Sequence, residues 1–137
     1  MRIVIGTNAI ISAALFENST PGQALALALR RGDLLLSLAT LAELSEVLRR
    51  PKFARYVTPA ESEEFLATLV ERATFIEIRD EIIACRDPKD DKFLEVAVNG
   101  SADCIVSGDA DLRILHPFRG ILILPPDEFL RLYSSSP

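Results

Sequence analysis

Tryptophan is absent from this 137-residue sequence, and it contains only one histidine and two cysteines. Two cysteines, Cys85 and Cys104, are too few for a disulfide framework, and both lie in apolar segments. We therefore expect buried free thiols in a reducing, cytoplasmic compartment. The single histidine, His116, precedes Pro117 and is interpreted as part of a surface turn rather than of a functional site.

Long apolar runs are also missing. No stretch reaches the ~18 apolar residues that a transmembrane helix requires, so we expect no membrane partner. The opening residues 1–5 are followed by a glycine, a threonine and an asparagine and not by a cleavage motif, so they predict a buried strand rather than a signal peptide. The length fits a single domain over residues 1–133, with a disordered tail at 134–137.

Positive charge is in short supply, because 15 lysines and arginines face 20 aspartates and glutamates and leave a net charge of −5. This balance argues against a general, charge-driven nucleic-acid binder. One local basic patch exists, formed by Arg49, Arg50, Lys52 and Arg55. It is either a solvated helix end, where cations are favourable, or a surface that contacts phosphates.

Short apolar segments alternate along the chain with amphipathic ones. The patterns predict strands at residues 2–5, 34–37, 74–78, 103–106 and 121–124. They predict helices at 9–15, 22–31, 41–50, 59–72, 88–99, 112–115 and 126–132. This alternation is typical of an α/β fold with three layers, in which helices cover both faces of a parallel sheet of four to five short strands.

Helix starts are predicted from capping residues. Thr20 is expected to cap the helix that Pro21 opens, and Thr40 is expected to cap the helix that ends at Pro51. Asp87 precedes a proline and is expected to cap the helix that follows.

Four acidic residues lie near the predicted junctions between strands and helices: Glu43, Asp91, Asp109 and Asp111. Ligands of open α/β sheets lie beyond the carboxyl ends of the strands, so we expect these side chains to share one edge of the sheet. Carboxylates without companion histidine or cysteine suit Mg²⁺ or Mn²⁺. Such an ion can activate a water molecule and hold a phosphodiester for in-line attack.

Each acid also has a purely structural interpretation. Glu43 would complete a capping box with Thr40, and Asp91 would lie at a favourable helix N-terminus. Asp109 would be an N-cap and Asp111 a solvated side chain. Their joint position at one sheet edge favours a shared site. Asp87 and Asp90 are less expected as ligands.

Five segments carry a further signal: Arg2–Asn8 (RIVIGTN), Thr40–Phe53 (TLAELSEVLRRPKF), Asp87–Glu95 (DPKDDKFLE), Ala102–Leu112 (ADCIVSGDADL) and Ile123–Leu130 (ILPPDEFL). Together they resemble the PIN domain family, in the branch of bacterial toxin–antitoxin proteins similar to VapC. The likeness covers nearly the whole chain.

This resemblance implies a PIN-like three-layer fold and a Mg²⁺- or Mn²⁺-dependent endoribonuclease that acts on RNA. It also implies a homodimer that a cognate antitoxin protein neutralises. The site residues that it implies are Glu43, Asp91, Asp109 and the auxiliary Asp111 as metal ligands, with Thr7 and Asn8 beside them. The basic residues Arg49, Arg50, Lys52, Arg55 and Lys92 are the candidates for RNA binding, and Lys92 and Arg113 neighbour the acids.

Position 6 departs from the family pattern, because Gly6 stands where the first metal-binding aspartate is expected. Loss of that carboxylate should weaken metal binding and misplace the attacking water, and one positioned electrostatic group is commonly worth ~10²–10³ in rate. Gly6 is either a natural degeneration or a selected or engineered substitution, since one base change converts an aspartate codon to glycine. The otherwise intact pattern favours a recent loss.

Other functions fit less well. A phosphate-accepting receiver domain would have an acidic pair after the first strand, and a dinucleotide-binding domain would have a glycine-rich turn there. The alternative that remains is a non-catalytic module with the same fold, which binds an antitoxin or RNA without cleavage. Metal-dependent cleavage distinguishes the two.

Overall fold

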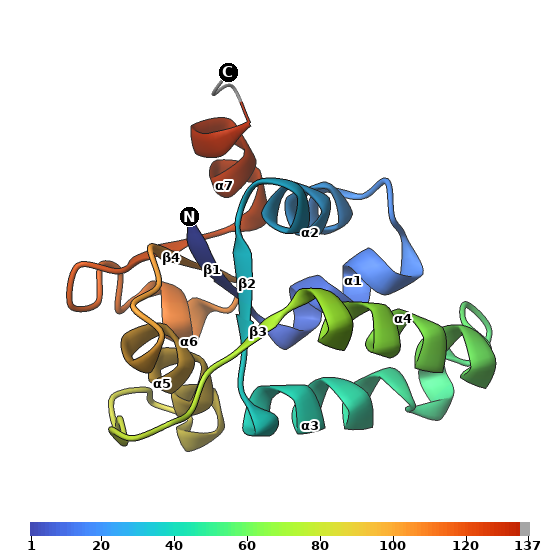
Figure 1. The fold of residues 1–137 in the computed structure, drawn as a ribbon, viewed down its shortest axis with the longest axis horizontal. Coiled ribbons are helices and arrows are strands. Elements are labelled where there is room, and N and C mark those ends of the chain that lie inside the picture. Colours follow the sequence, from blue (N-terminus) through green and yellow to red (C-terminus); the bar gives the residue numbers. More distant parts are fainter. Residues whose placement is uncertain (135–137) are drawn as a thin grey trace.

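A five-stranded parallel sheet forms the centre of the molecule. The computed structural model describes residues 1–134 (Figure 1). The strand order is β3-β2-β1-β4-β5, and every neighbouring pair is parallel. The strands are β1 (Arg2–Ile5), β2 (Asp33–Leu36), β3 (Thr74–Phe75), β4 (Cys104–Val106) and β5 (Leu122–Leu124). The predicted parallel α/β sheet is therefore confirmed, with β1 at its middle.

Helices cover both faces of this sheet. They are α1 (Thr7–Leu15), α2 (Thr20–Arg31), α3 (Leu38–Leu48), α4 (Pro59–Arg72), α5 (Asp91–Asn99), α6 (Ala110–Arg113) and α7 (Pro126–Tyr133). Two short 3₁₀ turns, η1 (Pro51–Phe53) and η2 (Pro88–Asp90), precede α4 and α5. Among these residues no helix is long and apolar enough to cross a membrane.

The alternation of side chains along β1 divides the core into two. Ile3 and Ile5 pack with α1, α2, α3, α4 and α7 on one face, whereas Val4 packs with α5 and α6 on the other. Successive strand residues point to opposite faces, so a fully apolar strand serves both cores. Figure 1 shows α5 and α6 on the opposite side of the strands from α1 to α4.

Two predicted helix caps were wrong by one or three residues. Ser19, not Thr20, caps α2, because its Oγ accepts the Gly22 N–H. Ser37, not Thr40, caps α3: the Ser37 Oγ accepts the Thr40 N–H at 3.1 Å, and the Thr40 Oγ1 accepts the Ser37 N–H at 2.9 Å. Glu43 is therefore not a capping-box residue and lies in the second turn of α3.

The predicted helix after Asp87 is divided into two. The Asp87 side chain accepts the Lys89 N–H, which confirms its capping role, but the turn that it starts is η2, and α5 begins only at Asp91. The strand expected at 74–78 is limited to Thr74–Phe75, which pair with the last two residues of β2. Ser134 follows α7 directly, and the rest of the predicted tail, 135–137, lies outside the described residues.

Candidate functional site

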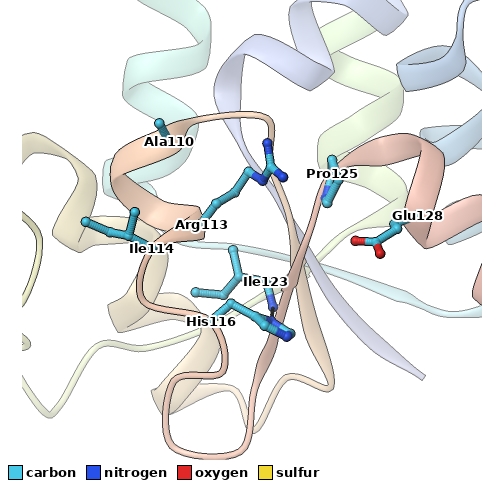
Figure 2. Close-up of a pocket in the computed structure, with 7 residues that line it drawn as sticks. All are labelled: Ala110, Arg113, Ile114, His116, Ile123, Pro125 and Glu128. Atoms are coloured by element: carbon cyan, nitrogen blue, oxygen red, sulfur yellow. Dashed lines mark hydrogen bonds between the residues drawn. The ribbon is translucent and has the colours of Figure 1, made fainter.

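Helix α6 contributes to two separate hollows. The smaller, of about 350 Å³, lies between α6, β5 and α7, with Arg113 and Glu128 on its walls (Figure 2). His116 closes one side, and its Nδ1 accepts the Ile123 N–H at 2.8 Å. His116 therefore anchors a loop to β5. Arg113 lines this hollow and does not lie among the predicted metal ligands.

The larger hollow is a cleft of about 680 Å³ at the carboxyl ends of β1 and β4. Its floor includes Gly6, Ser107 and Gly108, which follow those strands. Its walls carry both charges: the acids Glu43, Asp87, Asp90 and Asp109, and the bases Arg50, Lys52 and Lys89. The expected edge of the sheet is thus where charged side chains meet.

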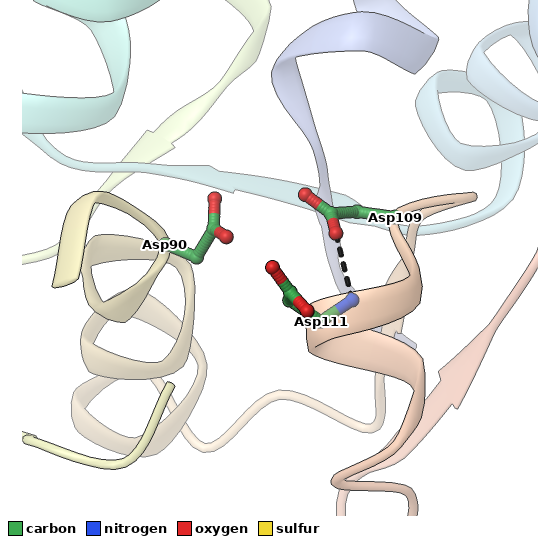
Figure 3. A group of neighbouring side chains, drawn as sticks. All are labelled: Asp90, Asp109 and Asp111. Carbon is green, nitrogen blue, oxygen red and sulfur yellow. Dashed lines mark hydrogen bonds between the residues drawn. The ribbon is translucent and has the colours of Figure 1, made fainter. Parts of the chain in front are cut away.

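Three aspartates in this region lie close enough to hold one metal ion. Carboxylate oxygens of Asp90, Asp109 and Asp111 lie within 4.8 Å of one another, and their carboxylates point toward one another (Figure 3). The Asp109 side chain caps α6 by accepting the Asp111 N–H at 2.8 Å. Its own N–H donates to the Ser107 Oγ at 3.0 Å. Asp109 therefore serves as an N-cap and as a member of the cluster at once.

The environment of Asp90 reflects this crowding. Burial raises the pKa of Asp90 to about 6, helped by the negative charges of Asp109, Asp87, Asp111 and Glu43. A divalent cation between the carboxylates would relieve both costs. The donor set consists of oxygen only, which suits Mg²⁺ or Mn²⁺.

Asp91 is not part of this cluster, although the sequence analysis gave it as a candidate metal ligand. It is only 7% exposed, and its Oδ1 accepts the N–H groups of Ala84, at 3.0 Å, and Cys85, at 2.8 Å. Burial by itself raises the pKa of Asp91, but the hydrogen bonds from Cys85 and Ala84 outweigh it and leave the pKa below its usual value. Asp91 thus holds the preceding loop against α5, and Asp90 takes the place in the cluster that was expected of Asp91.

Glu43 lies in the cleft with both carboxylate oxygens engaged. Its Oε2 accepts a short hydrogen bond from the Thr7 hydroxyl, and its Oε1 accepts one from the Lys92 ammonium at 2.8 Å. Asn8 lines the cleft next to Thr7. Glu43, Thr7 and Asn8 are therefore brought together, but Glu43 lies apart from the three-aspartate cluster.

The backbone at Gly6 does not require glycine. Its φ of −64° and ψ of 155° are extended values that any residue adopts. A Cβ atom at this position would lie 3.3 Å from the Ser107 Oγ and 3.4 Å from the Ser107 Cβ, with no closer neighbour. A small movement of the Ser107 side chain would make room for a larger residue at position 6.

The model of the PIN domain family matches residues 2–111 of this chain. The chain belongs to the PIN domain family. The fold is also similar to that of a chain in the solved structure of VapBC2 from Rickettsia felis bound to a DNA fragment from their promoter, with a TM-score of 0.62. That likeness covers 91% of this chain and 98% of the other at 14% identity. None of the curated proteins compared matches this chain.

The basic residues of this PIN domain divide into two groups. Arg50 and Lys52 line the acidic cleft, as does Lys89, which the sequence did not single out. Its position in the segment that also carries Asp90 was the signal that could have identified it. Arg49 and Arg55 are exposed but do not line the cleft, and the Arg55 guanidinium lies over the Tyr56 ring.

Proposed function

We propose that this PIN domain is the scaffold of a Mg²⁺- or Mn²⁺-dependent endoribonuclease of a toxin–antitoxin pair, impaired in this chain by Gly6. The observation that supports the proposal best is the cleft at the ends of β1 and β4, which Asp90 and Asp109 line together with Arg50, Lys52 and Lys89. Asp111 lies close to both aspartates. A cation held by acids, beside bases that contact phosphates, is an arrangement that supports metal-assisted phosphodiester hydrolysis.

In this proposal Asp90, Asp109 and Asp111 hold the metal ion. When bound, the ion supplies an activated water and neutralises charge that develops on the phosphate. Asp90 is preferred to Asp91 as a ligand because the Asp91 side chain is buried outside the three-aspartate cluster, where its Oδ1 accepts the N–H groups of Ala84 and Cys85. Asp109 keeps its capping hydrogen bond to Asp111, which fixes the direction of both side chains.

The basic residues are proposed to bind the RNA backbone. Arg50, Lys52 and Lys89 would contact phosphates next to the cleft, and Arg49 and Arg55 would extend the positive surface beyond it. The chain as a whole is acidic, with a net charge of −5. RNA would therefore be attracted mainly at this rim.

Gly6 is the proposed cause of impairment. The family pattern has a carboxylate at this position, where the chain leaves β1 beside Ser107. Without it, one negative charge and one metal ligand are lost from the centre of the site. A loss of ~10²–10³ in rate is the expected scale for one positioned electrostatic group.

The partners are proposed from the family and its structural relative. VapBC2 is a pair of proteins bound to promoter DNA. By analogy, we propose that this chain forms a homodimer in the cytoplasm and binds a cognate antitoxin protein.

A non-catalytic binding module is the second candidate. Two observations favour it: the absent side chain at Gly6, and the engagement of both Glu43 oxygens by Thr7 and Lys92. Such a module would bind RNA or antitoxin through the same cleft without cleavage.

Ribonuclease assays separate the two candidates. The chain and its Gly6→Asp variant are incubated with an RNA pool and Mg²⁺ or Mn²⁺, with EDTA and the double variant Gly6→Asp/Asp109→Asn as controls. We expect the Gly6→Asp variant to cleave RNA and the unsubstituted chain not to. EDTA, or the added Asp109→Asn substitution, should abolish this cleavage. Equal cleavage by both chains would refute the impairment, and no cleavage by either would favour the binding module.

A further inference from the structure

The hollow between α6, β5 and α7 has charged walls that the proposed nuclease site does not use. Its volume of about 350 Å³ lies at the lower end of the ~300–1,000 Å³ that is usual for small-molecule sites. Arg113, His116 and Glu128 line it together with the isoleucines 114 and 123. Figure 2 shows the Arg113 head group above and the Glu128 carboxylate at the right, with Ile123 and His116 below them. A ligand here meets a cation, an anion and an apolar surface at once.

The two charged head groups are available to a ligand. Within residues 1–134 the Arg113 guanidinium has neither an ion pair nor a hydrogen bond, although Glu128 lines the same hollow. The Glu128 Oε1 lies 3.5 Å from the guanidinium of Arg131, and the two side chains are 46% and 68% exposed. An exposed pair of this kind contributes little, so a ligand can compete for the Glu128 carboxylate.

Among the four bases of RNA, guanine matches this pair of head groups. Its N1–H and N2–H groups donate side by side, which suits the two oxygens of one carboxylate. Its O6 and N7 atoms accept side by side, and a guanidinium can donate to both. Adenine and cytosine place an acceptor beside their amino group, which repels a carboxylate, and uracil has a single N–H donor. Only guanine therefore offers paired hydrogen bonds to Glu128 and Arg113 together.

Apolar side chains supply a surface for the flat face of a base. Ile123 is buried, whereas Ile114, which also lines the hollow, is 72% exposed. Bases that leave a stack are held by hydrogen bonds at their edges and by apolar contacts at their faces. A base over Ile114 would remove apolar surface from water on both partners.

The hollow is a neighbour of the acidic cleft. Ala110 lines it, and the adjacent residues Asp109 and Asp111 belong to the three-aspartate cluster. Helix α6, a single turn over residues 110–113, separates the two, and a helix with its side chains is about 10–12 Å across. A single-stranded RNA whose backbone lies in the cleft can therefore place a base a few nucleotides away in the hollow.

We propose that this hollow is a guanine subsite for single-stranded RNA, in which Glu128 accepts N1–H and N2–H and Arg113 donates to O6 and N7 of an unstacked base. Sequence-specific recognition of RNA generally uses such edges of unstacked bases. The inference rests on the proposed function for the RNA itself, and adds which base is recognised beside the cleft and by which residues.

Binding of mononucleotides to the whole chain in EDTA tests the subsite without metal. Guanosine, adenosine, cytidine and uridine monophosphates share the phosphate, so a difference in affinity reports the base. We expect the guanosine nucleotide to bind roughly tenfold or more tightly than the others, because paired hydrogen bonds to a base discriminate on that scale. The amide NMR signals of Ala110 and Ile123 should shift. Equal affinities, or shifts confined to residues of the cleft, would overturn the inference.

Base analogues assign each edge of guanine to its residue. Inosine monophosphate lacks the 2-amino group and the 7-deazaguanosine nucleotide lacks N7, and each should bind roughly five- to tenfold less tightly than guanosine monophosphate. Glu128→Gln should remove the first difference and Arg113→Met the second. Asp127→Asn, in the same turn of α7 but outside the hollow, and Arg119→Met are the matched controls and should keep both. Differences that persist in Glu128→Gln and Arg113→Met would refute the assignment.

Labelled RNA distinguishes a base subsite from a site for free nucleotides. By anisotropy in EDTA, an oligouridine with one central guanosine should bind roughly tenfold more tightly than oligouridine alone, and the two should bind equally to Glu128→Gln. Equal affinities for the wild-type chain would overturn the role in RNA, whatever the mononucleotides do. If the guanine preference holds but Gly6→Asp cleaves no RNA, the proposed nuclease fails and the subsite stands. Thermal melts of each variant verify that it is folded.

Discussion

Asp90 and Asp91 are neighbours in the sequence, yet their carboxylates have opposite environments. The pKa of Asp90 is raised to about 6, first by burial and then by nearby acids. The pKa of Asp91 is lowered, because two backbone N–H groups outweigh its burial. At the scale of single residues, Asp90 is thus suited to a cation and Asp91 to holding its loop.

The raised pKa of Asp90 predicts a pH dependence of stability in the absence of metal. Because the folded state binds the Asp90 proton more tightly than the unfolded state, its contribution to stability falls as pH rises from about 4 to about 6. Asp90→Asn should therefore stabilise the chain by roughly 1–2 kcal/mol at pH 7.5 and by much less at pH 4. Denaturant unfolding in EDTA at both pH values measures this, and equal effects at both would contradict it.

Asp91→Asn should have the reverse effect. It weakens the acceptor for the Ala84 and Cys85 N–H groups, which lie in a partly buried loop, and should cost roughly 1–3 kcal/mol of unfolding free energy at pH 7.5. The contribution of Asp91 is present above its ordinary pKa and is lost as pH falls through its lowered value. Mn²⁺ affinity of folded Asp91→Asn should stay near that of the wild type; a loss as large as that of Asp90→Asn would show that Asp91 is a ligand.

At the scale of elements, the strands could be predicted well from the sequence and the helix starts less well. Short, mostly apolar runs between turns are typical of buried strands. Each of the five strands overlaps its predicted range, although β3 is limited to Thr74–Phe75. Ser37 and Thr40 both carry hydroxyl groups three residues apart, so composition alone does not tell which one is the cap. The choice depends on where β2 ends.

The same difficulty explains why Asp90 was not favoured as a metal ligand in the sequence analysis. The segment from Asp87 reads as one helix, but η2 and α5 divide it, and this decides whether Asp90 or Asp91 faces the cleft. The two hydrogen bonds that hold Asp91 come from Ala84 and Cys85, in a loop with no pattern of its own. Asp109 was predictable because it follows a buried strand directly.

The cap of α3 gives a prediction at this scale. Ser37→Ala removes the buried hydroxyl that accepts the Thr40 N–H, and should lower the unfolding free energy by about 0.5–2 kcal/mol. Ser45→Ala, within the same helix, is the control and should change it by only a few tenths of a kcal/mol. Equal effects in chemical denaturation would show that Ser37 is not the cap that matters.

At the scale of the whole molecule, an acidic chain carries a cleft with three bases on its walls, Arg50, Lys52 and Lys89. The carboxyl ends of β1 and β4 meet at a single cleft. Its aspartates come from η2, from the residue before it and from the segment between β4 and α6, and the segment after α3 supplies Arg50 and Lys52. The net charge of −5 therefore describes the chain but not its cleft. We therefore expect RNA to bind at this cleft. Its affinity should depend on salt through only a few phosphate contacts.

Lys89→Ala should weaken RNA binding and reduce the salt dependence. Each phosphate contact with a single strand contributes about −0.7 to the slope of log affinity against log salt. We expect the slope to become shallower by about that amount in Lys89→Ala, and to be unchanged in Arg131→Ala, a residue of α7 outside the cleft. Fluorescence anisotropy with a labelled RNA in EDTA measures both, and identical slopes would place the RNA elsewhere.

The central claim, that position 6 is a missing metal ligand, is tested most directly by calorimetric titration of Mn²⁺ into the chain and into Gly6→Asp. The Gly6→Ala variant is the control, because it places the same Cβ atom beside Ser107 without a carboxylate. The account predicts an affinity roughly tenfold or more higher for Gly6→Asp, since one ligand charge is added, and no gain for Gly6→Ala. Equal affinities in all three folded chains would contradict it.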